Sequence, residues 1–147
     1  MYFTNNKLSG IIPTEIGQLT ELDTLGMGNN AFMGTLPTEF GHLTNLHYLR
    51  TGRNGLSGNL PTELGLCTSL ANVAIRSNSF SGPLPAEPLG LTKLTTLIAF
   101  SNSFTGSLPT ELGLWSSLEQ NLDFSDCNFT GPIPSEIVSR VFNVIYR

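Results

Sequence analysis

The stretch that decides the fold runs from Leu43 to Leu66 and reads LTNLHYLRTGRNGLSGNLPTELGL. It is one copy of a 24-residue unit, and nearly all of the chain consists of further copies in the same register. Within it, an Asn-x-Leu/Phe-x-Gly-x-Leu/Ile-Pro core spans Asn54 to Pro61. One such unit is too short to bury its own leucines, but stacked units bury them against one another. A fixed period of this length therefore indicates a solenoid of similar coils.

The core recurs every 24 residues at Asn6, Asn30, Asn54, Asn78 and Asn102. Its last copy starts 25 residues further on, at Cys127, and we place the extra residue among Glu119, Gln120 and Asn121. The column of asparagines, like the glycines of the core, is predicted to be structural because it recurs in every coil. The predicted organisation is a partial repeat at 1–18, full repeats at 19–42, 43–66, 67–90, 91–114 and 115–139, and a tail at 140–147.

The second unit shows what each part of a coil is expected to do. The alternation Leu25-x-Met27 predicts a short strand. The side-chain amide of Asn30 can satisfy backbone groups where that strand ends. Gly34 supplies a turn that a Cβ would hinder, and Pro37 stands where a helical turn can begin. Gly41 is expected to close that helical turn.

These positions resemble the plant-type leucine-rich repeat, Leu-x-x-Leu-x-x-Leu-x-Leu-x-x-Asn-x-Leu/Phe-x-Gly-x-Leu/Ile-Pro-x-x-Leu-Gly, over about residues 1–139. This subclass is found in ectodomains of receptor-like kinases and receptor-like proteins, and in polygalacturonase-inhibiting proteins. The resemblance implies an α/β repeat solenoid, a right-handed superhelix with a concave parallel β-sheet. It also implies short 3-10 turns and an extra short strand on the convex side.

The chain departs from the family pattern at several positions. Thr51 and Ala99 fill a slot where the family prefers Leu, and Cys127 replaces the ladder asparagine. Pro88 replaces the usual Leu, so the turn at 85–90 should be locally distorted. The cysteine-bearing caps of secreted family members are missing, although solenoid ends need polar caps. We therefore expect a segment of a longer array or a truncated product.

Composition excludes some classes of function. The net charge is −4, and the seven Lys and Arg residues form no run, so no nucleic-acid partner is expected. No apolar run approaches the ~20 residues that span a bilayer, so this segment is not expected to insert into a membrane. Met1 to Asn6 lack the features of a signal peptide. An extracellular or plasma-membrane location, with a role in signal transduction, is implied by the resemblance alone.

The tail leaves the repeat register after about Ile137. Ile137, Val138, Val141, Val144 and Ile145 have helical spacing, and Ser135 is a suitable N-cap. This pattern favours a helix that covers the last coil. The alternative is a tail without designed structure.

The residues between the inward leucines should form the outer face of the strands, because a strand alternates sides. Along the coils this face predicts a basic patch of Arg50, Arg53 and Arg76 beside Tyr48, an apolar patch of Ile98 and Phe100, and an acidic end of Asp123 and Asp126. Arginine forks suit carboxylates and phosphates, and arginines with aromatic residues are enriched at binding hot spots. Gly28 and Gly52 leave space there for a ligand backbone. The alternative is a solvated face with chance clustering.

A second column is acidic, namely Glu15, Glu39, Glu63, Glu87, Glu111 and Glu136. Each Glu lies two residues after a repeat proline, where a carboxylate faces the positive end of a helical turn. Solvated first-turn carboxylates are one interpretation, and a cation-binding ridge is the other. Asp123 to Asp126 resembles half of a metal loop but offers too few oxygens for Ca²⁺. We predict no metal site and no cofactor.

Catalysis has little support. His42 and His47 are isolated, and Cys67 and Cys127 are expected to be buried free thiols, more than two coils apart. Asn128-Phe129-Thr130 is a glycosylation sequon, which matters only in a secreted protein.

We therefore expect a non-enzymatic module that binds a protein or peptide, possibly through an anionic group of that ligand. The predicted ligand-binding residues are Tyr48, Arg50, Arg53, Arg76, Ile98, Phe100 and Asp123. The alternative is a structural or assembly segment whose open ends pair with other coils.

Overall fold

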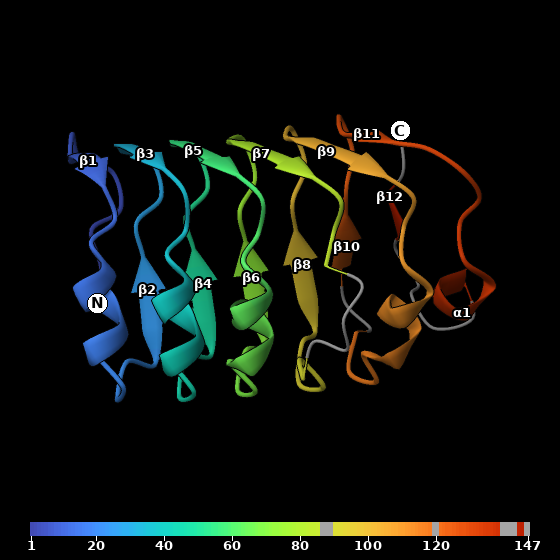
Figure 1. Ribbon diagram of the computed structural model, residues 1–147, viewed down its shortest axis with the longest axis horizontal. Coiled ribbons are helices and arrows are strands. Elements are labelled where there is room, and N and C mark those ends of the chain that lie inside the picture. The colour runs from blue at the N-terminus through green and yellow to red at the C-terminus, as the bar shows by residue number, and fades with distance from the viewer. Residues whose placement is uncertain (86–89, 119–120, 139–143, 146–147) are drawn as a thin grey trace.

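The computed structural model describes residues 1–85, 90–118 and 121–138, and the backbone of Val144 and Ile145. The chain winds as a row of similar coils, with the N-terminus at one end of the row (Figure 1). Neighbouring coils present the same elements side by side, so segments that are 24 residues apart in the sequence lie next to each other. This arrangement confirms the predicted α/β solenoid.

One strand from each coil joins a parallel sheet with the order β12-β10-β8-β6-β4-β2. We call it the concave sheet, after the position that the family resemblance implies. The strands are short because only a few residues of each unit run straight before the chain turns. Their bounds are β2 Thr24–Gly26, β4 Tyr48–Arg50, β6 Asn72–Ala74, β8 Thr96–Ile98, β10 Asn121–Asp123 and β12 Val144–Ile145.

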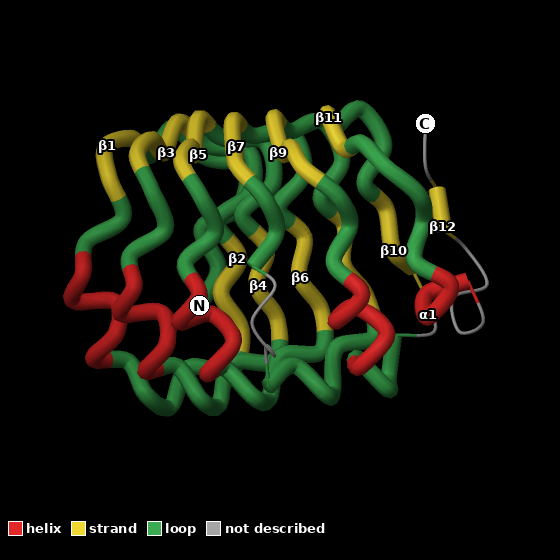
Figure 2. The backbone as a smooth tube through the Cα atoms, turned by 45° about the vertical axis from the view of Figure 1, so that its right-hand side comes forward, coloured by secondary structure: helices red, strands yellow, loops and turns green. Residues whose placement is uncertain are grey.

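The expected extra strand forms a second parallel layer with the order β1-β3-β5-β7-β9-β11. Figure 2 shows these strands on a different side of the coils from the strands of the concave sheet. Their bounds are β1 Ser9–Ile11, β3 Ala31–Gly34, β5 Gly55–Gly58, β7 Ser79–Gly82, β9 Ser103–Gly106 and β11 Asn128–Phe129.

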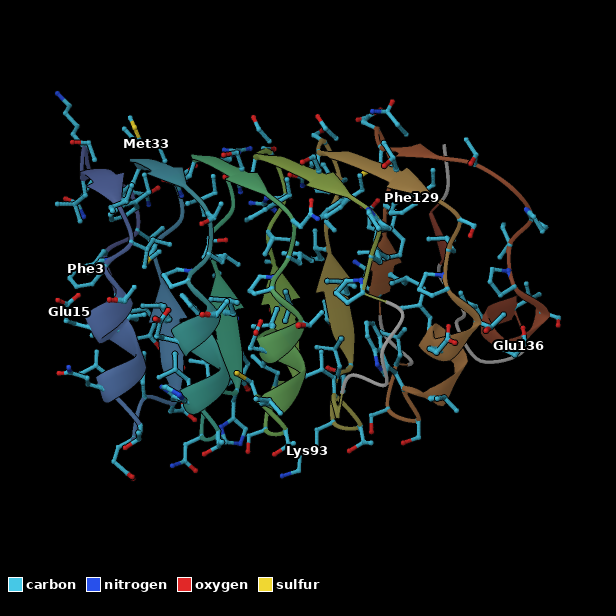
Figure 3. All side chains as sticks on the ribbon, in the orientation of Figure 1. Phe3, Glu15, Met33, Lys93, Phe129 and Glu136 are labelled. Carbon is cyan, nitrogen blue, oxygen red and sulfur yellow. The ribbon has the colours of Figure 1, made fainter. Side chains whose placement is uncertain are left out.

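Within the described residues, the predicted 3-10 turns are present on a third side of the coils (Figure 2). Each begins directly after the repeat proline, as Pro37 and η2 show, and each carries the column glutamate in its first turn. Figure 3 shows Glu15 and Glu136 at opposite ends of this side of the molecule. The bounds are η1 Thr14–Gln18, η2 Thr38–His42, η3 Thr62–Leu66 and η4 Thr110–Leu114, and the corresponding turn near the C-terminus is the short helix α1, Ser135–Val138.

The asparagine ladder is confirmed as a backbone-satisfying device. The side-chain amide of Asn54 donates to the carbonyl oxygens of Met27 at 3.1 Å and Thr51 at 2.9 Å. Its Oδ1 accepts a hydrogen bond from the N–H of Phe32 at 3.1 Å. Asn30, Asn78 and Asn102 bond in the same way, so each of these asparagines ties its own coil to the preceding one, where the strands end and the sheet can no longer pair the backbone.

The core is a continuous column of apolar side chains inside the coils. Leu25, Leu49 and Leu70 are fully buried. Phe80 and Phe104 stack with ring centroids 6.2 Å apart, and Phe104 and Phe129 stack at 6.0 Å. Side chains at equivalent positions of successive repeats therefore pack against each other, as the 24-residue period predicts.

Two expectations about glycine and the tail need correction. Gly41 does not close its turn in a left-handed conformation, because it lies inside η2; among the glycines of the described residues, positive φ is found at Gly34 and the other core glycines. The described helix of the tail ends at Val138, and Val144–Ile145 form a strand that pairs in parallel with β10 rather than continuing a helix. The backbone of Val144 and Ile145 therefore extends the concave sheet by one strand.

The remaining expectations for the chain have mixed outcomes. Cys67 is fully buried as expected, whereas Cys127 is only half-buried, and both thiols are free. The distortion predicted at Pro88 falls outside the described residues, as do two of the positions where we placed the extra residue, Glu119 and Gln120. The boundary of the tail at 139/140 stays a prediction.

Candidate functional site

The outward side chains of the concave sheet form straight rows that cross the strands. Strand register aligns Gly26 with Arg50, Arg50 with Ala74, Ala74 with Ile98, and Ile98 with Asp123. We call these five residues the central row. Tyr48 lies beside it, in register with Asn72. The sheet thus brings together residues that are up to four repeats apart in the sequence.

A second row follows two residues later in each coil and consists of Gly28, Gly52, Arg76, Phe100 and Ser125, which we call the distal row. Backbone carbonyls in this row accept hydrogen bonds from the preceding coil, as the 2.9 Å bonds from Arg53 N–H to the Arg76 oxygen and from Ser77 N–H to the Phe100 oxygen show. Arg50 of the central row and Arg76 of the distal row therefore lie on adjacent coils, diagonally across the sheet.

Each of these two arginines lies over an aromatic ring. The guanidinium carbon of Arg50 is 5.4 Å from the ring centroid of Tyr48, and that of Arg76 is 5.7 Å from the centroid of Phe100. At these distances the ring face attracts the cation and restricts where the long side chain can point. Both ring contacts therefore restrict the conformations of the two arginine side chains.

Small residues keep the space between the arginines open. A groove of about 360 Å³ lies on the sheet. Its floor includes Gly28, Gly52 and Ala74, and both Arg50 and Arg76 border it. A Cβ on Gly52 would lie 3.0 Å from Cγ of Arg76, so the missing side chain lets the stem of that arginine cross the sheet.

The structure brings some predicted site residues together and separates others. Arg50, Arg76 and Ile98 line the groove, and Tyr48 and Phe100 touch its arginines. Arg53 lies on the turn after β4 with φ of 58° and is not among the lining residues. Asp123 follows Ile98 in the central row.

Three lining residues, Thr4, Asn29 and Asn72, are additions to the predicted site. The sequence offered a signal for them, because Thr4 and Asn29 hold the repeat positions of Arg76 and Arg53, and Asn72 holds that of Tyr48. Their polar side chains alone do not distinguish a groove wall from an ordinary solvated surface, so only the register assigns them to the groove.

The guanidinium groups have no carboxylate partner in the described part of the chain. The close contact between a basic and an acidic side chain found there joins His47 Nδ1 to Asp23 Oδ1 at 2.9 Å, before β4 begins. The same ring nitrogen lies 2.9 Å from the carbonyl oxygen of Asn45. Arg50 and Arg76 thus present uncompensated positive charge to the groove, where an anion can be bound by charge-assisted hydrogen bonds.

Asp123 is the acidic counterpart at the far end of the central row. Its Oδ1 accepts hydrogen bonds from the backbone N–H of Ser125 at 3.0 Å and from the Ser125 hydroxyl at 2.6 Å. These two bonds fix the direction of the carboxylate. Asp126 lies on the following turn with φ of 53°, is exposed, and accepts a hydrogen bond from the Ser101 hydroxyl at 3.4 Å.

The thiols lie apart from the groove. Burial raises the pKa of Cys67 to about 11, and its Sγ donates to the carbonyl oxygen of Phe40 at 2.9 Å. Burial also raises the pKa of Cys127, with smaller contributions from the negative charges of Asp123 and Asp126. Both shifts make the thiols poorer nucleophiles, because the thiolate is the reactive form.

The described residues hold no candidate for a metal site or a membrane-spanning helix. No three His, Cys, Asp or Glu side chains there gather as a metal site would require. None of the helices in that part of the chain has the length and apolar character needed to cross a bilayer. Asn128 of the sequon is exposed on β11.

Comparisons with known proteins agree with this geometry. The family described as Leucine Rich Repeat matches residues 1–19 and 120–139. No curated protein matches the chain. Among solved structures, the leucine-rich-repeat ectodomain of the plant membrane receptor kinase GASSHO1/SCHENGEN3 from Arabidopsis thaliana, in complex with CASPARIAN STRIP INTEGRITY FACTOR 2, is similar with a TM-score of 0.93 and 39% identity. The match covers 97% of this chain and 17% of that one.

Two further structures are similar. The ectodomain of the Arabidopsis receptor kinase HAESA, in complex with an N-terminally extended IDA peptide hormone, has a TM-score of 0.94 and 30% identity, and the match covers 99% of this chain and 24% of that one. A plant ice-binding protein has a TM-score of 0.89 at 24% identity, covering 100% of this chain and 48% of that one, which shows the shared fold alone.

The 24-residue period, the two parallel sheets with their 3-10 turns and these likenesses together define a leucine-rich-repeat solenoid. The chain belongs to the plant-type leucine-rich-repeat proteins. It spans only 17% and 24% of the length of the two receptor ectodomains above.

Proposed function

We propose that the chain is a non-enzymatic module that binds a peptide or protein on its concave sheet. Arg50 and Arg76 take an anionic group of the ligand, and Tyr48, Phe100 and Ile98 provide the apolar contacts. The observation that carries this proposal is the groove between two arginines that are already stacked on aromatic rings and have no carboxylate partner among the described residues.

Preorganisation is the physical reason that this arrangement favours binding. A free arginine loses side-chain entropy when a ligand fixes it, whereas a stacked arginine has lost much of that freedom already. The glycine floor lets a ligand backbone approach the sheet closely, because no Cβ projects there. Planar guanidinium groups can then bind a carboxylate or phosphate through two parallel hydrogen bonds.

The comparisons support the same class of ligand. The HAESA ectodomain was solved with a peptide hormone, and it is 30% identical to this chain. The plant receptor RGFR1, in complex with RGF2, is described as a peptide hormone receptor and is 29% identical. We extend peptide binding to this chain as part of the proposal.

Binding to acidic peptides tests the proposal. The chain is titrated with a pool of end-blocked acidic decapeptides and with a matched pool in which every carboxylate is replaced by its amide. We expect the acidic pool to bind more tightly, and the variant R50E/R76E to lose at least about tenfold in affinity, because charge-assisted hydrogen bonds are replaced by repulsion.

Arg53→Asn is the control for the loss of a single positive charge. It removes a positive charge from the same face but lies outside the groove, and Asn tolerates the left-handed backbone of that position better than Arg does. We expect its affinity to stay within about threefold of the parent chain. Equal affinities for both pools, or an unchanged affinity in R50E/R76E, would contradict the proposal. Self-association without peptide binding would favour the assembly alternative.

We also propose an extracellular or plasma-membrane location, supported by the receptor ectodomains that the chain resembles. Asn128 is then available for glycosylation, since it is exposed and lies in the β1–β11 layer, on a different side of the coils from the proposed binding face. A catalytic role is not proposed, because neither His42 nor His47 lines the groove and burial suppresses the thiolates of Cys67 and Cys127.

A further inference from the structure

The central row has opposite charges on either side of an uncharged stretch. Arg50 stands on β4, Ala74 and Ile98 follow on β6 and β8, and Asp123 stands on β10. Arg76 adds a second positive charge in the distal row, one coil after Arg50. The face therefore changes from basic to apolar to acidic along the direction that crosses the strands.

The spacing of the strands sets the distance between the charges. Adjacent parallel strands lie ~4.8 Å apart, so Arg50 and Asp123 are separated by about 14 Å along the row, and Arg76 and Asp123 by about 10 Å. An extended peptide advances ~3.4 Å per residue. A ligand lying along the row passes from the arginines to Asp123 within about three to four residues.

The carboxylate of Asp123 is positioned to take part. Ser125 occupies only its Oδ1, through the two hydrogen bonds at 3.0 and 2.6 Å. No basic side chain in the described residues forms an ion pair with Asp123, and its neighbour in the row, Ile98, carries no charge. A fixed and unpaired carboxylate at one end of a face whose other end is basic is complementary to a dipolar ligand.

We propose that the concave face selects an extended peptide that carries an acidic and a basic side chain about three to four residues apart. The acidic side chain lies at Arg50 and Arg76, the basic side chain lies at Asp123, and an apolar side chain between them packs on Ile98 and Phe100. This inference rests on the function proposed above and specifies the class of ligand.

A thermodynamic cycle tests the pairing with Asp123. The probe is an end-blocked seven-residue peptide in which a glutamate and a lysine are separated by alanine, leucine and alanine. Its partner peptide has norleucine in place of lysine, which keeps the aliphatic stem and removes the charge. We expect the parent chain to bind the lysine peptide about threefold to tenfold more tightly, and Asp123→Asn to bind both peptides equally.

Asp126→Asn is the matched control, because it removes the same charge from the turn that follows and keeps a residue that tolerates positive φ. It should retain the preference for the lysine peptide. Asp123→Lys should reverse the preference, so that a peptide with a second glutamate in place of the lysine binds more tightly.

The outcomes separate the two proposals. If Asp123→Asn keeps the full preference for lysine, or if the parent chain shows none, the dipolar inference is wrong. If, in that case, the affinity still depends on the glutamate of the peptide and on Arg50 and Arg76, the proposed function stands although the dipolar inference fails. If neither peptide binds and the acidic pool does not bind either, the proposed function fails together with the inference.

Discussion

At the scale of single residues, Thr51 shows how a repeat slot can be occupied by a residue that does not suit it. The slot is apolar in the neighbouring coils, where Met27 and Ile75 fill it. Thr51 is fully buried, and its hydroxyl has no hydrogen-bond partner. A buried unsatisfied hydroxyl costs about 1–3 kcal/mol of stability. The sequence indicated the misfit, but only the burial shows that the hydroxyl is cut off from water.

Thr51→Val should therefore stabilise the chain by about 1–2 kcal/mol, because it replaces the hydroxyl with a methyl of similar size. The ladder bonds that Asn54 and Asn78 donate to the Thr51 carbonyl are retained, since they involve only the backbone. Urea unfolding followed by circular dichroism measures the change. Thr105→Val on the exposed face of β9 is the control and should be neutral. A destabilised Thr51→Val variant would show that the hydroxyl has a partner in solution.

The positions of the three arginines show how far single residues of the site could be predicted from the sequence. All three were predicted to face the same sheet, and the register brings Arg50 and Arg76 to one groove. Arg53 differs because it lies on the turn after β4, where the backbone is left-handed, and it does not line the groove. Alternation alone cannot reveal this change, since it assumes that the strand continues.

At the scale of elements, the 3-10 turns pack more closely than the repeat pattern suggests. A Cβ on Gly41 would lie 2.9 Å from the carbonyl oxygen of Glu63 and 3.0 Å from its Cβ. Likewise, a Cβ on Gly17 would lie 2.7 Å from both the Cβ and the carbonyl oxygen of Glu39. The turn glycine of one coil thus packs directly against the turn glutamate of the next coil. This contact explains why the glycine recurs although its backbone does not require it.

Gly41→Ala should destabilise the chain by about 1–3 kcal/mol, because the methyl forces η2 and η3 apart. The effect opposes the usual preference for Ala over Gly in helical segments. Gly55→Ala is the matched control, since its Cβ would meet only the Phe32 carbonyl oxygen at 3.3 Å. Both variants are compared by urea unfolding. Equal effects of the two substitutions would mean that the close packing of the turns is not the cause.

At the scale of the whole molecule, one apolar column runs through all described coils, and Cys67 lies within it, fully buried. Burial raises its pKa to about 11 from an ordinary value of 9.0. The unfolded thiol therefore loses its proton first as the pH rises. The contribution of Cys67 to stability is complete below pH 9 and is lost between about pH 9 and 11.

The free energy of unfolding should accordingly fall by up to about 2 kcal/mol more in the parent chain than in Cys67→Val between pH 8 and pH 11. Parallel urea titrations at both values measure the difference, and the variant accounts for the tyrosines and lysines that titrate in the same range. A parallel decline in the two proteins would show that Cys67 is accessible to water in the folded chain.

The sequence by itself determined the solenoid, because identical spacing of leucine, asparagine, glycine and proline leaves stacked coils as the way to bury the leucines. It also determined which face of the strands carries Arg50 and Asp123, since strand alternation is local. Only the tertiary structure decided that Arg50 and Arg76 share a groove, that Gly52 makes room for the stem of Arg76, and that Val144–Ile145 extends the sheet. These features depend on contacts between coils, and the spacing within one coil does not encode them.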